Sequence, residues 1–296
     1  MEIHIRPFKV TAGTGEYVAH LPTSPEFAMK KLLSGGLERI YQIARVFRNE
    51  PLSSTHLPEF TMLEWYRAND SLERIKDDCK ELLSVISQNV HQSLVFESNE
   101  MTINLTEWKS TTTRELFIQY TDLDIAKLIN FRDFSAAVIK NELFQTIPDS
   151  ISNWDDLYFY VWLNHIEPKI DPTTPLFVTH YPESQAALAQ IVTDDEGNQW
   201  ADRFELYLGG YELANAFNEL TDPDVQLNRF ENDMNTRKSI YGDKFPPSPI
   251  DHELIRALRE GLPKSAGIAV GVDRLVMLFS GVIDIRHTVW LEPYQT

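Results

Sequence analysis

The sequence predicts an α+β fold in which helices flank a mainly antiparallel sheet. Residues 45–67 have the pattern of strand, loop and strand, and residues 202–220 contain two strands joined by Gly209 and Gly210. Between them, apolar residues recur every three or four positions over residues 71–90, which predicts an amphipathic helix packed on the sheet. No repeat or linker divides the 296 residues, so we expect one domain over 1–296.

The composition excludes several classes of protein. Lys and Arg total 27 against 44 Asp and Glu, and the net charge of −17 argues against broad electrostatic capture of nucleic acid. Cys79 is the single cysteine, so no intrachain disulfide can form and a reducing, cytoplasmic setting is expected. The chain has no signal-peptide pattern, and no apolar run approaches the roughly 20 residues of a membrane helix.

The first elements follow from alternation and from helix start signals. Ile3–Phe8 alternates in polarity and predicts an early strand. Ser24 is the expected N-cap of a helix with Pro25 at its first position, and Gly35-Gly36 is expected to end that helix.

The 45–67 hairpin gathers side chains suited to a nucleotide. Arg48 and Glu50, two residues apart at the end of the first strand, are predicted to share one face. A continuous second strand would place four more side chains on one face: His56, Phe60, Glu64 and Tyr66. An arginine can donate two hydrogen bonds to phosphate oxygens, and an aromatic ring can stack on a base. Carboxylates can bind a cationic ligand or a metal ion. A half-exposed hairpin with a solvated charged face explains the same spacing equally well.

The middle of the chain carries fewer signals. Cys79 lies in the apolar stripe of the 71–90 helix and is interpreted as a core residue rather than a nucleophile. Residues 97–172 are interpreted as a helical insertion, in which Asp155 and Asp156 begin a helix that ends near His165.

The second hairpin has a parity problem that predicts a bulge. Asn215, Phe217 and Glu219 share a face of the second strand, whereas Glu212 has the wrong parity to join them. A bulge near Leu213–Ala214 would return Glu212 to that face. Helices are then expected over 224–241 and 251–260.

The stretch from Gly267 to Arg274 is the last informative one. Its small residues allow a ligand to approach the backbone closely, and Arg274 enters at the start of an apolar helix. Taken alone, this pattern is weak evidence for a ligand site, because helix packing is its ordinary explanation.

Taken together, these segments resemble the class II aminoacyl-tRNA synthetases. Phe47-Arg48-Asn49-Glu50 with His56-Leu57-Pro58-Glu59-Phe60 resembles motif 2 of that family, and Gly267–Arg274 resembles motif 3. The lysine-type branch is indicated by Thr23-Ser24-Pro25-Glu26 and by 212–220. Within it, Ser184–Gln190 and Ala269 are similar to the free-standing paralogues that ligate (R)-β-lysine to elongation factor P.

Motif 1, which usually forms the dimer interface of the family, should precede Ile3–Phe8, and no equivalent is found. The resemblance therefore implies either a truncated start or the loss of this element, and it leaves a homodimer open.

The resemblance implies ATP and Mg²⁺ as cofactors and assigns the nucleotide contacts. Arg48 would hold the α-phosphate and Arg274 the γ-phosphate, and these two are the expected catalytic residues. The remaining nucleotide contacts would come from Glu50, His56, Phe60 and Glu212, with Phe60 on the adenine and His56 on the phosphate tail. Glu205 and Glu212 would carry magnesium, an interpretation favoured over the alternative that each is one half of a surface ion pair.

The same resemblance implies an acidic amino-acid pocket. Its members would be Glu26, Glu64, Tyr66, Asn215, Phe217, Glu219 and Ala269. Glu219 with Tyr66 would take one substrate ammonium, and Glu26 with Glu64 the other. Ala269 stands where the synthetases usually have glycine and would shorten the pocket. Ala216, also in place of glycine, would narrow it.

The implied activity is adenylation of (R)-β-lysine or lysine followed by transfer to a lysine of elongation factor P. The acidic surface and the lack of a preceding anticodon-binding barrel disfavour transfer RNA as the acceptor. Two other hypotheses stay open. One is an adenylating ligase with another acceptor, a small molecule or transfer RNA, and the other is a non-catalytic paralogue that acts as a binding module.

Overall fold

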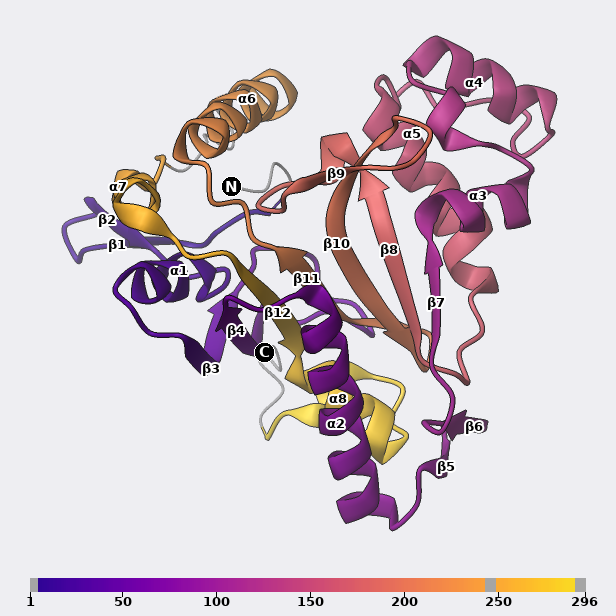
Figure 1. Ribbon diagram of the computed structural model, residues 1–296, viewed down its shortest axis with the longest axis horizontal. Helices are drawn as coiled ribbons and strands as arrows, with labels where there is room; N and C mark the ends of the chain where they lie inside the picture. Colours follow the sequence, from indigo (N-terminus) through magenta and orange to yellow (C-terminus); the bar gives the residue numbers. More distant parts are fainter. Residues whose placement is uncertain (1–4, 243–248, 291–296) are drawn as a thin grey trace.

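A computed structural model describes residues 5–242 and 249–290, and one large sheet runs through it (Figure 1). Its strand order is β3-β4-β12-β11-β10-β8-β7, with β9 paired to β10. Each pair of neighbours is antiparallel except β7 and β8, which run parallel. The predicted α+β fold with a mainly antiparallel sheet is confirmed.

The helices expected over 71–90, 224–241 and 251–260 and both predicted hairpins are present in the structure. The strands of the large sheet are β3 (Arg39–Phe47), β4 (Glu59–Ala68), β7 (Lys109–Thr112), β8 (Leu176–Pro182), β9 (Ile191–Thr193), β10 (Gln199–Leu208), β11 (Tyr211–Asn218) and β12 (Ser265–Gly271). Two small ribbons are β1 (Lys9–Thr11) with β2 (Tyr17–His20) and β5 (Val95–Ser98) with β6 (Met101–Asn104). The α-helices are α1 (Glu26–Ser34), α2 (Leu72–His91), α3 (Thr113–Thr121), α4 (Phe131–Lys140), α5 (Trp154–Val161), α6 (Pro223–Tyr241), α7 (His252–Gly261) and α8 (Val272–Ser280).

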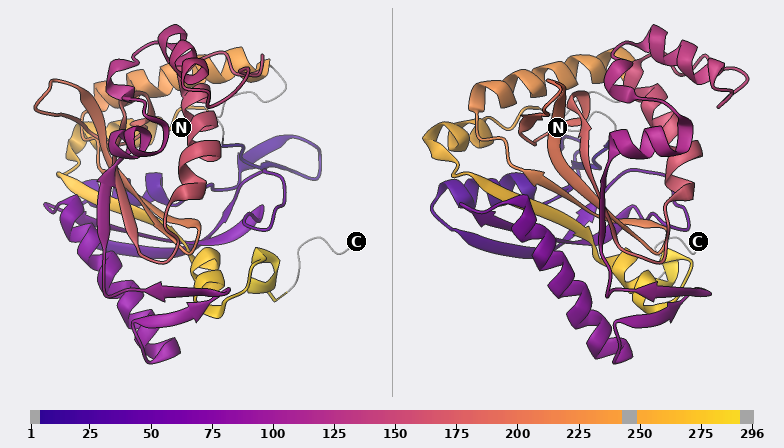
Figure 2. Two further views of the ribbon diagram at one scale, coloured as in Figure 1. Left: turned by 90° about the vertical axis from the view of Figure 1, so that its right-hand side faces the viewer. Right: turned by 45° about the vertical axis from the view of Figure 1, so that its right-hand side comes forward.

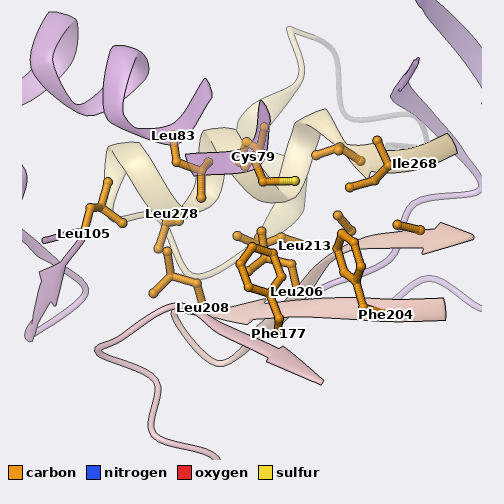
Figure 3. Packing of buried hydrophobic residues seen from close by; sticks show 14 of the residues in the cluster. Cys79, Leu83, Leu105, Phe177, Phe204, Leu206, Leu208, Leu213, Ile268 and Leu278 are labelled. Carbon is orange, nitrogen blue, oxygen red and sulfur yellow. The ribbon is translucent and has the colours of Figure 1, made fainter. Parts of the chain in front are cut away.

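Because side chains alternate along each strand, one face of the sheet is apolar and the opposite face carries most of the polar side chains. Even-numbered residues of β10 and β12, such as Phe204 and Ile268, pack against α2 and α8 in a buried cluster (Figure 3). Cys79 of α2 belongs to this cluster, and burial raises the pKa of its thiol. A buried thiol kept protonated serves packing, as expected from its place in the apolar stripe.

The predicted bulge lies in β11. Leu206 pairs with Ala214 and Tyr207 pairs with Glu212, which leaves Leu213 as the additional residue. An additional residue reverses the alternation, so Glu212 shares its face with Asn215. The sheet thereby directs both side chains away from the apolar cluster.

Two further apolar clusters pack the remaining helices. Helices α1, α6 and α7 share one cluster around Phe230, and α3, α4 and α5 share another that includes residues of β8 and β10. The insertion helices gather beside the β7 and β8 edge in Figure 1 and in both views of Figure 2. The interpretation of 97–172 as helical needs correction, because β6, β7 and part of β5 occupy its first part.

The start of the chain differs from the prediction. Ile3 and His4 lie outside the described residues, and residues 5–8 form no strand. Their backbone carbonyls bind elsewhere, since the Ile5 carbonyl accepts from Arg237 and the Arg6 carbonyl accepts from the Asn49 amide, both at 2.7 Å. Helix α1 begins at Glu26, one residue later than expected, and the Ser24 hydroxyl accepts from its amide at 3.2 Å.

Candidate active site

A cavity of about 710 Å³ opens on the face of the sheet opposite α2 and brings together most of the predicted site residues. Those lining it are Glu26, Arg48, Glu50, His56, Phe60, Glu64, Glu212, Asn215, Phe217, Ala269 and Arg274. Tyr66, Glu205 and Glu219 do not line it, but Tyr66 contacts Glu64, Glu205 acts electrostatically on Glu212, and Glu219 on Glu26. Residues from motif 2, motif 3 and the second hairpin therefore meet in one place.

Arg48 and Phe60 stand together at one end of this cavity. Strand β3 ends at Phe47, so Arg48 and Glu50 lie in the following loop rather than on the strand, where the Arg48 amide donates to the Pro58 carbonyl at 2.8 Å. The Arg48 guanidinium carbon lies 5.3 Å from the Phe60 ring centroid. Arg48 Nε is buried and has no hydrogen-bond partner among the described residues. A buried, unsatisfied cationic donor beside an aromatic face suits an anion attached to a planar base.

Arg274 is held on two sides at the start of α8. Its Nη1 donates to the Glu212 carbonyl at 2.6 Å, and its Nη2 lies 2.9 Å from His56 Nε2. The neighbouring Asp273 accepts from the Thr61 amide at 2.7 Å and so ties α8 to β4. These contacts fix the direction of the guanidinium.

His56 was predicted on a strand, but β4 begins at Glu59 and His56 lies in the loop before it. Its Nδ1 is 3.0 Å from the hydroxyls of Ser53 and Thr55. Burial, followed by the nearby Arg274, lowers the pKa of His56. A neutral imidazole accepts from Arg274 at Nε2 and donates at Nδ1, so His56 orients Arg274.

The two carboxylates predicted to bind magnesium face one another in different surroundings. Glu205 accepts from the hydroxyls of Tyr181 at 2.6 Å and Tyr207 at 2.7 Å, and from Arg203 at 2.5 Å. Burial, and then the proximity of Glu205, raise the pKa of Glu212 to about 7.

Within residues 5–242 and 249–290, no group of three or more His, Cys, Asp or Glu side chains could hold a metal. Two carboxylates still fit magnesium, which commonly takes one or two carboxylates and completes its shell with phosphate and water oxygens.

The opposite end of the cavity is acidic. The Tyr66 hydroxyl donates to Glu64 at 3.2 Å, and burial raises the pKa of Glu64 to about 8, with Glu26 adding to the rise. Asn215 Oδ1 and Glu219 Oε1 are buried acceptors without a hydrogen-bond partner in the described part of the chain. Unsatisfied acceptors beside carboxylates favour an ammonium ligand.

Sequence reasoning missed Lys30, which lies among these acids. Its ammonium is 2.8 Å from Glu26 Oε1 and 2.5 Å from Glu219 Oε2. Lys30 follows Glu26 by four positions on α1, and that spacing was the available signal. Its contact with Glu219 depends on how α1 packs against the end of β11, which the sequence pattern does not contain.

Two alanines were expected to shape the pocket, and only one lies on it. Ala269 lines the cavity between Glu64 and Asn215, its cross-strand partners in β4 and β11. Ala216 has no exposed surface and belongs to the apolar cluster on the other face of the sheet. The expectation that Ala216 narrows the site was wrong, because strand alternation turns its methyl group away.

Comparison with known proteins agrees with this geometry. The family model for class II tRNA synthetases (D, K and N) matches residues 2–292. This chain belongs to the class II tRNA synthetase family. As a member of that family, it is 40% identical to the elongation factor P–(R)-beta-lysine ligase of Yersinia enterocolitica over 97% of this chain and 83% of the relative.

The same name belongs to relatives from Edwardsiella ictaluri and Yersinia pestis. They are 40% and 38% identical, and each comparison covers 94% of this chain and 79% of the relative. In the part of the class II chain that the structure describes, no helix is both long and apolar enough to cross a membrane.

Proposed function

We propose that this protein is an ATP-dependent ligase that adenylates (R)-β-lysine and transfers it to a lysine of elongation factor P. One observation carries the proposal: a single cavity has arginines at one end and unsatisfied acceptors with carboxylates at the other. This arrangement suits a nucleotide and a diamino acid held side by side. The shared name of the relatives supports the same reaction.

In the first step, a carboxylate oxygen of β-lysine attacks the α-phosphorus of ATP. The bond to the leaving pyrophosphate breaks, and a β-lysyl-adenylate remains. The nucleophile is already ionised, so no general base is needed, and the rate gain comes from alignment and from neutralising phosphate charge.

The nucleotide roles follow from the positions of the two arginines. Arg48, with its buried Nε, would neutralise the α-phosphate where charge develops, while Phe60 supports the adenine. Arg274, oriented by His56, would hold the far end of the triphosphate. Magnesium held by Glu205 and Glu212 would supply further neutralisation of phosphate charge.

The charges of the amino-acid pocket match a substrate with two ammonium groups. Glu26, Glu64 and Glu219 provide three carboxylates, and Lys30 provides one internal cation. Two substrate ammonium groups would bring these charges to balance. Because buried charge without a partner is costly, a monoamine would leave one carboxylate uncompensated.

In the second step, the neutral amine of a protein lysine attacks the acyl carbon of the adenylate. An amide forms, AMP leaves, and the amine loses its proton to solvent. The net charge of −17 disfavours transfer RNA as the acceptor. We place the reaction in the cytoplasm, in keeping with the single cysteine, Cys79, which is free and buried.

Intact-mass measurement of elongation factor P tests the proposal. The factor is incubated with this protein, ATP, magnesium and (R)-β-lysine, and we expect a mass increase of one β-lysyl group. Replacing the modified lysine of the factor by arginine should abolish the increase. An unchanged mass, together with ATP cleavage that depends on β-lysine, would point to another acceptor and overturn the assignment of elongation factor P.

A further inference from the structure

Lys30 is buried at the back of the acidic pocket and joins two elements that are far apart in the sequence. Its side chain is 2% exposed. The ammonium contacts Glu26 in the first turn of α1 and Glu219 just after β11. Glu26 lines the cavity, whereas Lys30 itself does not. Lys30 therefore acts on the cavity only through the carboxylates that it holds.

We propose that Lys30 is a positioning residue that fixes the separation of the Glu26 and Glu219 carboxylates, and through it the spacing of the two ammonium groups that the pocket accepts. This inference rests on the proposed function, because it assumes a diamino acid in the cavity.

The contact distances limit how far apart the two carboxylates can be. One ammonium touches Glu26 Oε1 at 2.8 Å and Glu219 Oε2 at 2.5 Å, so these two oxygens cannot be farther apart than the sum of those distances. Glu219 does not line the cavity, but its Oε1 is buried and has no hydrogen-bond partner among the described residues, so this oxygen would be the one to accept from a substrate ammonium. The same cation thus sets one carboxylate relative to the other and leaves a buried acceptor available.

The surroundings prevent Glu219 from moving to another place. A Cβ atom on Gly267 would lie 2.6 Å from Glu219 Oε1 and 2.2 Å from the Tyr66 ring, so the carboxylate is packed against the bare backbone of β12. Burial raises the pKa of Glu219, and the Lys30 ammonium opposes that rise. Without a cation at this position, the pKa of this buried carboxyl group would rise further, and the contact that holds the group in place would be lost.

The spacing of ammonium groups is the property in which the two lysine isomers differ. In β-lysine, the amine nearer the carboxylate is attached one carbon farther along the chain than in α-lysine. Its two ammonium groups are therefore separated by one methylene fewer. A pair of carboxylates held at fixed separation can read that difference, whereas a mobile pair would adapt to either isomer.

The test compares Lys30→Gln, Lys30→Arg and the matched control Lys31→Gln. Lys31 is the neighbouring lysine of α1 and has a partly exposed ion pair with Asp251 at 2.6 Å. The measurement is pyrophosphate exchange with (R)-β-lysine and with α-lysine, accompanied by thermal unfolding of each variant. The readout is the ratio of the two kcat/KM values, which a general loss of folded protein does not change.

We expect Lys30→Gln to raise the KM for β-lysine about tenfold or more and to bring the ratio close to one. Lys30→Arg keeps the positive charge but changes the length and shape of the side chain. The ratio of the two kcat/KM values should therefore also fall, while the protein stays folded. Lys31→Gln should leave the ratio unchanged.

A wild-type ratio in a folded Lys30→Gln protein would overturn the inference. Should Lys30→Gln fail to fold, a wild-type ratio in Lys30→Arg would overturn it, because charge alone would then be sufficient. If the wild-type protein exchanges pyrophosphate with neither isomer, the proposed function fails instead.

Discussion

Arg274 Nη2 lies 2.9 Å from the Nε2 atom of His56, and this contact joins motif 3 to the loop of motif 2. Burial and the adjacent guanidinium lower the pKa of His56, so the imidazole is a neutral acceptor at neutral pH. Because Arg274 also donates to the Glu212 carbonyl, its guanidinium is oriented by groups of the protein itself. Orientation in advance reduces the entropy that binding would otherwise cost.

We expect His56→Ala to raise the KM for ATP roughly tenfold, because Arg274 loses its one side-chain contact and keeps only those with the Glu212 and Thr55 carbonyls. His56→Gln can still present an acceptor and should recover part of the loss. Steady-state kinetics at saturating amino acid measure both effects. Equal KM values for ATP in the wild type and in His56→Ala would contradict an orienting role for His56.

Because Glu64 holds a proton in the folded protein, the protein without substrate should become less stable as pH rises. Burial raises the pKa of Glu64 to about 8 from its ordinary value of 4.5. Between these pH values, Glu64 holds a proton in the folded state that it releases in the unfolded chain. The free energy of unfolding therefore falls by up to about 1.4 kcal/mol per pH unit. Urea unfolding between about pH 6 and pH 8 measures the slope, which Glu64→Gln should reduce.

Binding should show the opposite dependence, because an ammonium ligand needs the ionised carboxylate. The affinity for β-lysine is expected to increase as pH rises toward about 8, with release of a proton on binding. Calorimetry in two buffers of different ionisation enthalpy detects that proton. Binding without proton release near neutral pH would show that Glu64 is already ionised in the empty pocket.

Gly267→Ala should destabilise the protein. The added methyl group would lie 2.2 Å from the Tyr66 ring, so the ring or the strand must shift, at a cost of about 1–3 kcal/mol. Gly271→Ala is the matched control on β12, where the nearest atom, from the Arg274 side chain, is 3.8 Å away. Denaturant unfolding of both variants is the measurement, and equal stabilities would refute the close approach of Tyr66 to Gly267.

Ala269→Gly should shift selectivity from β-lysine toward α-lysine. Its methyl group lies on the cavity wall between Glu64 and Asn215, and one methyl group in such a pocket changes selectivity roughly tenfold. Ala266→Gly is the control, since Ala266 lies on the same strand but faces the apolar cluster. Pyrophosphate exchange with both isomers gives the ratio, and an unchanged ratio in Ala269→Gly would exclude this role.

The parts of the fold that follow from local periodicity were predictable. The parity of Glu212 relative to Asn215 was enough to predict the bulge that the structure has at Leu213. The apolar stripe that contains Cys79 likewise predicted α2 and its buried face. In both cases the signal lies within a few neighbouring residues.

Contacts between distant elements were not predictable in this way. The ion pair of Lys30 with Glu219 depends on how helix α1 packs. The hydrogen bond from Tyr181 to Glu205 depends on the register of β8 and β10. His56 and Arg48 lie in a loop, where alternation carries no information about direction. The site residues could be named from motifs, but their partners required the three-dimensional arrangement.

The central claim is that Arg48 and Arg274 converge with the acidic pocket so that this protein activates a diamino acid with ATP. Pyrophosphate exchange in the presence of (R)-β-lysine tests it most directly. The account predicts exchange by the wild type, a loss of about 100-fold or more in Arg48→Ala and in Arg274→Ala, and little change in Arg45→Ala, whose side chain is 55% exposed. The account would be contradicted if the wild type exchanged pyrophosphate with neither lysine isomer. It would also be contradicted if Arg48→Ala and Arg274→Ala kept the exchange activity of the wild type.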